Sequence, residues 1–207
     1  AGAEALSRTR ELHQAMASMD DRCRVLLVEL ALASVSRSTS SQYTSFRTSV
    51  DLLINADQQV DLFEWMLLST IKASLAPRFE SFTQPKVRFF HPASVKRELN
   101  VLLSILARSG SRDETGIQHA FEQGAQLLNL PTLSLEPRES YRLDRLDQSL
   151  EVLNQCAPKL KKQILTAAAA CISADTKITS LEGELLRAVS ASLDCPMPLL
   201  LPGQPLL

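Results

Sequence analysis

The chain has 207 residues, 45% of them hydrophobic and 22% charged, which is ordinary for a globular protein long enough for one or two domains. Its 22 basic and 23 acidic residues give a net charge of −1, so neither the total charge nor any run of Lys or Arg predicts binding to nucleic acid. The apolar runs are far shorter than the roughly 20 residues of a membrane-spanning helix, and no signal peptide is visible.

Apolar residues recur at helical spacing along almost the whole chain, and Gly is scarce. The second predicted helix is apolar on most faces, so we expect it to be the central buried helix. Pro77 is expected to end the fourth helix, and a connector with a short extended piece at 87–90 follows it. A proline-rich tail follows the last helix. The predicted helices cover 3–17, 21–36, 43–54, 62–75, 95–109, 113–128, 142–155, 158–173 and 180–193.

The cysteines are spread along the chain and form no Cys-x-x-Cys pair. An even number permits two disulfides, but a chain of this length builds a sufficient core without them. We therefore expect reduced, buried thiols and a cytosolic location. The four residues are Cys23, Cys156, Cys171 and Cys195.

No catalytic constellation is visible. The three histidines, His13, His91 and His119, are followed by Gln, Pro and Ala, so none begins the His-Glu-x-x-His zinc motif, and we expect all three at the surface. No Cys has a His nearby in sequence, and neither a Gly-rich phosphate loop nor Gly-x-Ser-x-Gly is present. We expect neither an enzyme active site nor a cofactor in this chain.

Two stretches that lie 118 positions apart share one skeleton. Residues 54–75 read INADQQVDLFEWMLLSTIKASL and residues 172–193 read ISADTKITSLEGELLRAVSASL, with nine of 22 positions identical. Apolar positions stay in register further upstream, so the repeated unit is about three helices, 25–75 and 143–193. The repeat predicts an internally duplicated all-α bundle of about eight to nine helices. We expect one compact body of two units, 1–93 and 94–207.

Each copy of the repeat contains the spacing of a capping box. In Asp61-x-x-Glu64 and Thr179-x-x-Glu182, the first side chain is expected to accept a hydrogen bond from a free N–H of the new helix. The Glu reaches back to the backbone of the first residue and also faces the positive end of the helix dipole. The pattern therefore has a purely structural explanation.

The acidic residues of the repeat also allow a metal hypothesis. Asp57 with Glu64, and Asp175 with Glu182, offer the oxygen ligands that a divalent cation takes. Two carboxylates are few for a tight site, and the Asp-x-Asp-x-Asp-Gly series of an EF-hand is absent. The capping interpretation is therefore favoured over the metal-binding hypothesis.

Trp65 is the sole tryptophan and stands opposite Gly183 in the other copy. A position where two copies differ is a candidate for function, because pressure to keep the scaffold acts on both. With Leu62 and Met66, Trp65 is a candidate apolar patch for a protein partner. The alternative, which we favour, is that Trp65 covers the core between the two units.

The repeated phrase resembles the signature of the TerB-like helical family, named from tellurite-resistance proteins. That signature is Ala-Asp-Gly, two residues, a β-branched residue and an acidic residue that opens a helix. The matching residues are Ala56, Asp57 and Glu64 in the first copy and Ala174, Asp175 and Glu182 in the second. Gln58 and Thr176 stand where the family has Gly, so the family's acidic metal cluster is less expected here.

A narrower resemblance covers nearly the whole chain. The order and spacing of four segments look like the C-terminal cytoplasmic region of certain bacterial HtpX-type membrane zinc metalloproteases, in which a transmembrane and catalytic portion precedes a TerB-like tail. The segments are LHQAMASMDDRCRVLLVELALASVSR, VDLFEW, VLLSILARSG and LLRAVSASLDCPMP.

This resemblance implies a non-catalytic interaction or regulatory domain at the cytoplasmic face of the inner membrane. Zinc, membrane anchoring and the cleavage of membrane or misfolded proteins would belong to the preceding metalloendopeptidase part. The implied partners are that protease part, or protein substrates and regulators. The alternative function is a stand-alone TerB-like stress-response or divalent-metal-sensing protein that uses the four acidic residues of the repeat.

Overall fold

The computed structural model describes residues 2–17, 19, 21–54, 61–80, 85–110, 113–140, 142–174, 179–195 and 197. Over these residues the fold is all-α, as predicted, with nine α-helices and two short 3-10 helices. The α-helices are α1 (Gly2–Ala17), α2 (Asp21–Val35), α3 (Ser40–Ile54), α4 (Leu62–Phe79), α5 (Lys96–Gly110), α6 (Glu114–Leu127), α7 (Leu143–Leu153), α8 (Pro158–Ile172) and α9 (Ser180–Ser192). The 3-10 helices are η1 (Pro92–Val95) and η2 (Arg138–Ser140).

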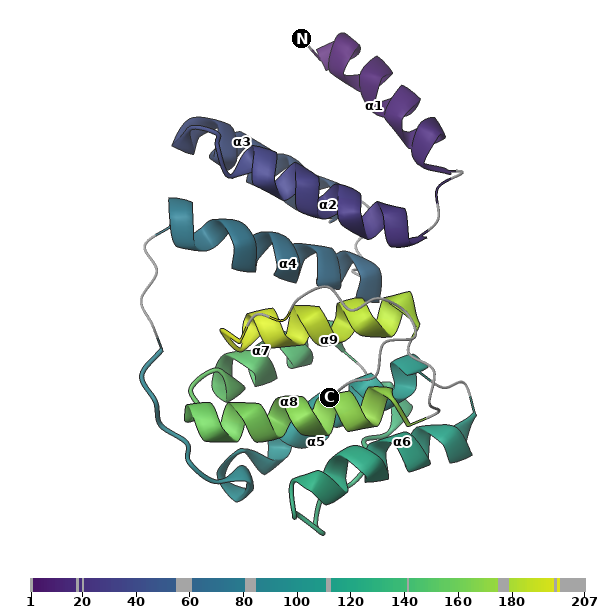
Figure 1. Cartoon of the computed structure of the whole chain (residues 1–207), viewed down its shortest axis with the longest axis vertical. Coiled ribbons are helices and arrows are strands. Elements are labelled where there is room, and N and C mark those ends of the chain that lie inside the picture. Colours follow the sequence, from purple (N-terminus) through teal and green to yellow (C-terminus); the bar gives the residue numbers. More distant parts are fainter. Residues whose placement is uncertain are drawn as a thin grey trace.

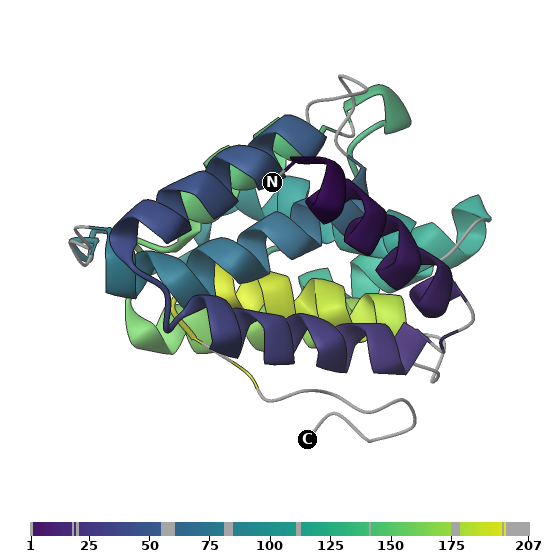
Figure 2. The same ribbon diagram turned by 90° about the horizontal axis from the view of Figure 1, so that it is seen from above.

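The helices form successive layers (Figure 1). α2 and α3 lie on one side of α4, and α4 packs along α9 on its other side. α5, α7 and α8 lie beyond α9, and α6 packs against α5 and α8 at the far end. α1 lies outside the layer of α2 and α3, as the view from above also shows (Figure 2).

The sequence repeat is present as two units of three helices, α2–α4 and α7–α9. α3 and α8 have the same length and begin and end at equivalent positions of the repeat. α4 and α9 each begin directly after a capping box. The direct contact of α4 with α9 places equivalent helices of the two units side by side.

Two clusters of buried apolar side chains hold these layers together. The larger cluster lies among α5, α6, α7, α8 and α9 and includes Trp65 and Met66 from α4. The smaller cluster consists of Leu32, Tyr43, Ile71 and Leu75, from α2, α3 and α4. α4 therefore contributes to both clusters and joins the first unit to the second.

α5, and not α2, is the central buried helix. Eight of the 15 residues of α5 are buried, because α6, α7 and α8 surround it. The expectation for α2 is wrong, since Leu30 is 66% exposed while Leu32 is 6% exposed. An apolar composition on all faces indicates burial only when neighbours cover every face, and α2 has α4 on one side.

Pro77 does not end α4, which continues to Phe79. The Tyr43 and Phe79 rings stack with their centroids 4.3 Å apart, and the Tyr43 hydroxyl donates to Glu80 Oε1 at 2.6 Å. These contacts fix the last turn on α3 and offset the cost of a proline within the helix. α6 begins after Asp113, whose side chain accepts from the Gly116 N–H.

The connector after α4 contains the expected short extended piece. Phe89 forms an isolated parallel bridge with Cys156. The Arg88 N–H donates to the Gln155 carbonyl at 2.8 Å, and the Ala157 N–H donates to the Phe89 carbonyl at 2.8 Å. The connector is thereby fixed to the turn between α7 and α8.

Among the helices in the described part of the chain, none combines the length and the apolar content that crossing a bilayer requires.

Candidate functional site

Both predicted capping boxes are present. At the start of α4, the Glu64 N–H donates to Asp61 Oδ1 at 2.8 Å, and the Asp61 N–H donates to Glu64 Oε2 at 3.1 Å. At the start of α9, the Glu182 N–H donates to Thr179 Oγ1 at 3.2 Å, and the Thr179 N–H donates to Glu182 Oε2 at 2.7 Å. The two Glu carboxylates thus satisfy backbone donors that the first helical turn leaves free.

Glu182 is the more deeply held of the two carboxylates, with a relative exposure of 3%. It also accepts from the Thr179 hydroxyl at 2.7 Å, and Gly110 of α5 approaches it closely. The other two residues of the metal hypothesis, Asp57 and Asp175, lie outside the described residues. Within the described part of the chain, no three His, Cys, Asp or Glu residues converge as metal ligands would.

The candidate patch of Leu62, Trp65 and Met66 is largely buried. Trp65 and Met66 have relative exposures of 3% and 4%, and Leu62 is half-buried against the larger cluster. The Trp65 indole N–H donates to Asp147 Oδ1 of α7 at 2.6 Å. This burial agrees with the favoured interpretation, in which Trp65 covers the core between the units, because α4 turns Trp65 and Met66 toward the second unit.

A groove of about 670 Å³ runs between the two units, and Trp65 is one of the residues that line it. α4 forms one side, with Arg47 and Asp51 of α3 beside it, and α7 and the C-terminal end of α9 form the other. The apolar and small residues of its floor are buried or half-buried. The floor residues are Trp65, Leu68, Ser69, Ala73, Ala76, Leu150, Ala191 and Ser192.

Charged side chains line the rim of the groove. On the α3–α4 side they are Arg47, Asp51, Lys72 and Glu80. On the α7–α9 side they are the carboxylates Asp147, Glu151 and Asp194, all three exposed. Two cationic and five acidic groups give this lining a net charge of −3.

The two sides of the rim differ in how their charges are paired. Arg47 Nη2 lies 3.8 Å from Asp51 Oδ1, so the α3–α4 side contains an ion pair. Asp147 accepts from the Trp65 indole, and Asp194 accepts from the Asn154 side-chain amide at 2.8 Å, so both have neutral donors. The three carboxylates of the α7–α9 side have no cation partner among the described residues.

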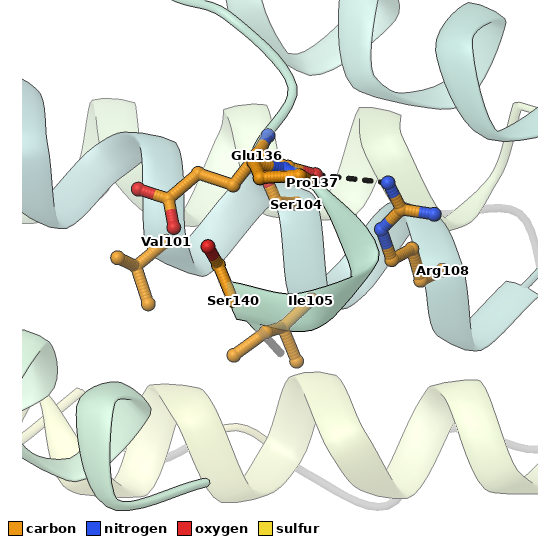
Figure 3. A pocket seen from close by; sticks show the side chains of 7 residues that line it. All are labelled: Val101, Ser104, Ile105, Arg108, Glu136, Pro137 and Ser140. Atoms are coloured by element: carbon orange, nitrogen blue, oxygen red, sulfur yellow. Dashed lines mark hydrogen bonds between the residues drawn. The ribbon is translucent and has the colours of Figure 1, made fainter. Parts of the chain in front are cut away.

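A second, much smaller cavity of about 10 Å³ lies beside Arg108 of α5 (Figure 3). Arg108 Nη2 donates to the Glu136 carbonyl at 2.8 Å, and the Glu136 N–H donates to Ser104 Oγ at 2.9 Å. These bonds fix the loop before η2 to α5. Arg108 Nε is buried and has no hydrogen-bond partner within the described residues. The space holds about one water molecule, so it is no ligand site.

Two of the cysteines and all three histidines lie where the sequence predicts. Cys156 and Cys171 are buried free thiols, and burial raises the pKa of Cys156 to about 11 and that of Cys171 to about 12. Such thiols are poor nucleophiles at neutral pH, because the reactive species is the thiolate. Cys195 is free but only half-buried, and the side chain of Cys23 lies outside the described part of the chain. The exposed histidines are His13, His91 and His119.

Sequence reasoning did not find the groove. Its acidic side comes from Asp147 and Glu151, whose equivalents in the first unit, Glu29 and Ala33, do not mark them as special. The one signal that pointed there was the difference between Trp65 and Gly183, since Trp65 lines the groove.

No protein-family model, curated protein or solved structure matches the chain. The resemblances to TerB-like domains and to HtpX-type proteases therefore rest on the sequence motifs alone. The groove is the candidate site on geometric grounds, because it is a large concave surface to which both units contribute.

Proposed function

We propose that the chain is a non-catalytic protein-interaction domain, the cytoplasmic C-terminal part of a membrane-anchored zinc metalloprotease of the HtpX type. The observation that supports the interaction function is the groove between the two units, which combines a floor of small and apolar residues with a charged rim. The connection to a protease is supported by the order and spacing of the four sequence segments that resemble such tails.

The groove has the anatomy of a surface that binds a polypeptide segment. Protein interfaces bury an apolar centre, and a polar rim stays in contact with water. Here the apolar residues that remain accessible in the lining are Leu68, Ala73 and Ala76, which are half-buried, while the rim residues Lys72, Asp147 and Glu151 are exposed. Its volume of about 670 Å³ accommodates several side chains of a partner.

In this proposal the chemistry lies in the preceding part of the parent protein. Zinc, the metalloendopeptidase activity and the membrane anchor belong to that part, at the inner membrane. This domain selects or presents protein substrates to it, or controls access to it. The partners are accordingly the protease part itself or its protein substrates and regulators, and not nucleic acid.

The first test is the size and location of the native protein in fractionated cells, detected with an antibody against this chain. A membrane-bound band much heavier than 22.8 kDa supports the proposal. A band near 22.8 kDa outside the membrane fraction overturns it. The alternative, a stand-alone metal-sensing protein, then requires stoichiometric divalent-cation binding that Asp57→Asn and Asp175→Asn abolish together.

The second test concerns the activity of the parent protein. Cleavage of a membrane substrate is compared between the intact parent, a parent that ends before residue 1, and a parent with Glu122→Lys on α6, far from the groove. A regulatory domain predicts that truncation changes the rate of substrate cleavage or the choice of cleavage sites, while Glu122→Lys leaves both unchanged. Identical cleavage by all three proteins would refute a regulatory role.

A further inference from the structure

We infer that the groove between α4 and α7 binds a basic, amphipathic protein segment, with cationic side chains on Asp147 and Glu151 and apolar side chains on the floor beside Trp65. The inference deepens the proposed interaction function and rests on it, but it does not depend on which protease, if any, precedes the chain. The inference is based on the shape of the groove, its local charge and the spacing of the carboxylates on α7.

The shape of the groove requires a partner with an apolar face. Its floor combines the buried side chains of Trp65 and Leu150 with half-buried Leu68 and Ala73. Small residues in the floor allow a backbone to approach closely, and the neighbouring apolar surface is stabilised by being covered. A segment that is polar on all sides would leave this floor without apolar contacts.

The charge of the groove requires that the partner also carries cations. The lining has a net charge of −3, from two cationic and five acidic groups, whereas the whole chain has a net charge of −1. The acidic excess is therefore local and not a property of the protein as a whole. A groove lined by charges of one sign raises the local concentration of ligands of the opposite sign.

The acidic excess is concentrated on one rim. Asp147 and Glu151 stand one helical turn apart on α7, and Asp194 follows α9 on the same side. The two cations that the described residues contribute to the lining stand on the opposite rim, where Asp51 and Glu80 accompany them. A bound segment with one cationic edge thus satisfies the α7 rim and keeps that edge away from the cationic groups of α3 and α4.

The spacing on α7 specifies the pattern of the partner. Residues four apart on a helix lie about 6 Å apart along its axis, so Asp147 and Glu151 present two carboxylates at that separation. A partner helix with Lys or Arg at positions i and i+4 presents cations at the same separation. Apolar residues at i+3 and i+7 of that helix point to the side that faces the floor.

The experiment uses Trp65 as its reporter, because it is the sole tryptophan and lines the groove. The probe is a peptide of about 18 residues, long enough to form a helix, built from Leu, Ala and Lys with Lys at i and i+4 and no aromatic residue. Two matched peptides carry Glu or Gln in place of every Lys. Binding to the full 207-residue chain is measured by Trp65 fluorescence and by calorimetry.

We expect saturable binding of the Lys peptide that shifts the Trp65 emission and weakens with added salt. Glu151→Lys should weaken that binding roughly fivefold, because it removes one exposed ion pair and sets a like charge against the peptide. The matched control is Glu122→Lys, which changes the total charge equally at an exposed position of α6. It should leave the affinity unchanged, because α6 lies at the far end of the molecule from α4 (Figure 1).

Four outcomes overturn the inference: no binding of the Lys peptide, equal binding of the Glu or Gln peptide, equal weakening by both variants, and binding that Glu151→Lys leaves unchanged. Far-UV circular dichroism and the unfolding temperature show whether each variant is folded, and Glu151→Gln serves as the second variant where Glu151→Lys is not. Failure here leaves the cell-fractionation result untouched, so the groove specificity and the identity of the parent are tested separately.

Discussion

Gly124→Ala is predicted to destabilise the protein, although Ala is the better helix former. Gly124 lies in the second half of α6, where α6 packs on α8. A Cβ atom at this position would stand 2.8 Å from the Ala167 carbonyl oxygen and 3.1 Å from Cys171 Cβ, both on α8. It would also stand 3.0 Å from Leu103 Cδ2 on α5.

The magnitude follows from two opposing effects. Ordinary van der Waals contacts of a Cβ begin near 3.4 Å, so α6 must move away from a backbone carbonyl that cannot rotate aside. Overpacking of this kind costs about 1–3 kcal/mol. The higher helix propensity of Ala offsets up to about 1 kcal/mol of this destabilisation. The net destabilisation is therefore up to about 2 kcal/mol, which lowers the unfolding temperature by up to about 8 °C in a domain of this size.

The assay is urea unfolding followed by circular dichroism, with Gly116→Ala as the matched control. Gly116 lies in the first turn of the same helix and is half-buried, whereas Gly124 is buried, so Ala at Gly116 tests the effect of helix propensity. We expect the two substitutions to change the unfolding free energy in opposite directions. Equal stabilisation by both would refute the close approach of α6 to α8.

Three further predictions concern the caps, the contact between the units and the buried thiols. Thr179→Ala should cost about 1 kcal/mol of unfolding free energy in urea titrations, while Thr179→Ser, which keeps the hydroxyl, should cost far less; equal losses would exclude the capping role. Asp147→Ala should cost about 1–3 kcal/mol, because it leaves the buried Trp65 N–H without its acceptor, and Asp147→Asn should restore most of this in the same assay. The ordinary thiol pKa is 9.0, and burial raises that of Cys156 to about 11 and that of Cys171 to about 12. The stability that the protonated thiols contribute is complete below pH 9 and is lost as the pH rises from 9 toward 12, since the unfolded chain releases these protons first. The unfolding free energy should therefore fall over this pH interval, and it should fall less steeply in Cys171→Ala. An unchanged slope in that variant would contradict a raised pKa for Cys171.

Local structure was predictable because it depends on residues that are close together in the sequence. Apolar spacing located all nine helices of the described part of the chain, and the two Asp/Thr-x-x-Glu patterns identified the starts of α4 and α9. The end of α4 was missed because the contact of Phe79 with Tyr43, 36 positions away, outweighs the local effect of Pro77. Tertiary contacts of this kind are not visible in a periodicity.

The site was harder to predict than the fold because a groove is made by residues distant in sequence. The repeat indicated two units, but not that α4 would lie along α9. Trp65 was correctly singled out as the difference between the copies, and the core interpretation matches its burial. The acidic rim was missed, because Asp147, Glu151 and Asp194 look like ordinary surface residues in the sequence. Only the packing of α4 beside them makes them part of a groove.

The two copies also show why one sequence pattern acquires two environments. Leu53 and Cys171 occupy equivalent positions on α3 and α8, yet Leu53 is 74% exposed and Cys171 is 2% exposed. α5 and α6 cover α8, and no helix among the described residues covers α3 in the same way. The second unit, α7–α9, thus shares the larger core with α5 and α6, whereas α2 and α3 of the first unit are attached through α4. Because Trp65 of α4 both contacts Asp147 and lines the groove, the joint between the units and the candidate binding surface are the same structure.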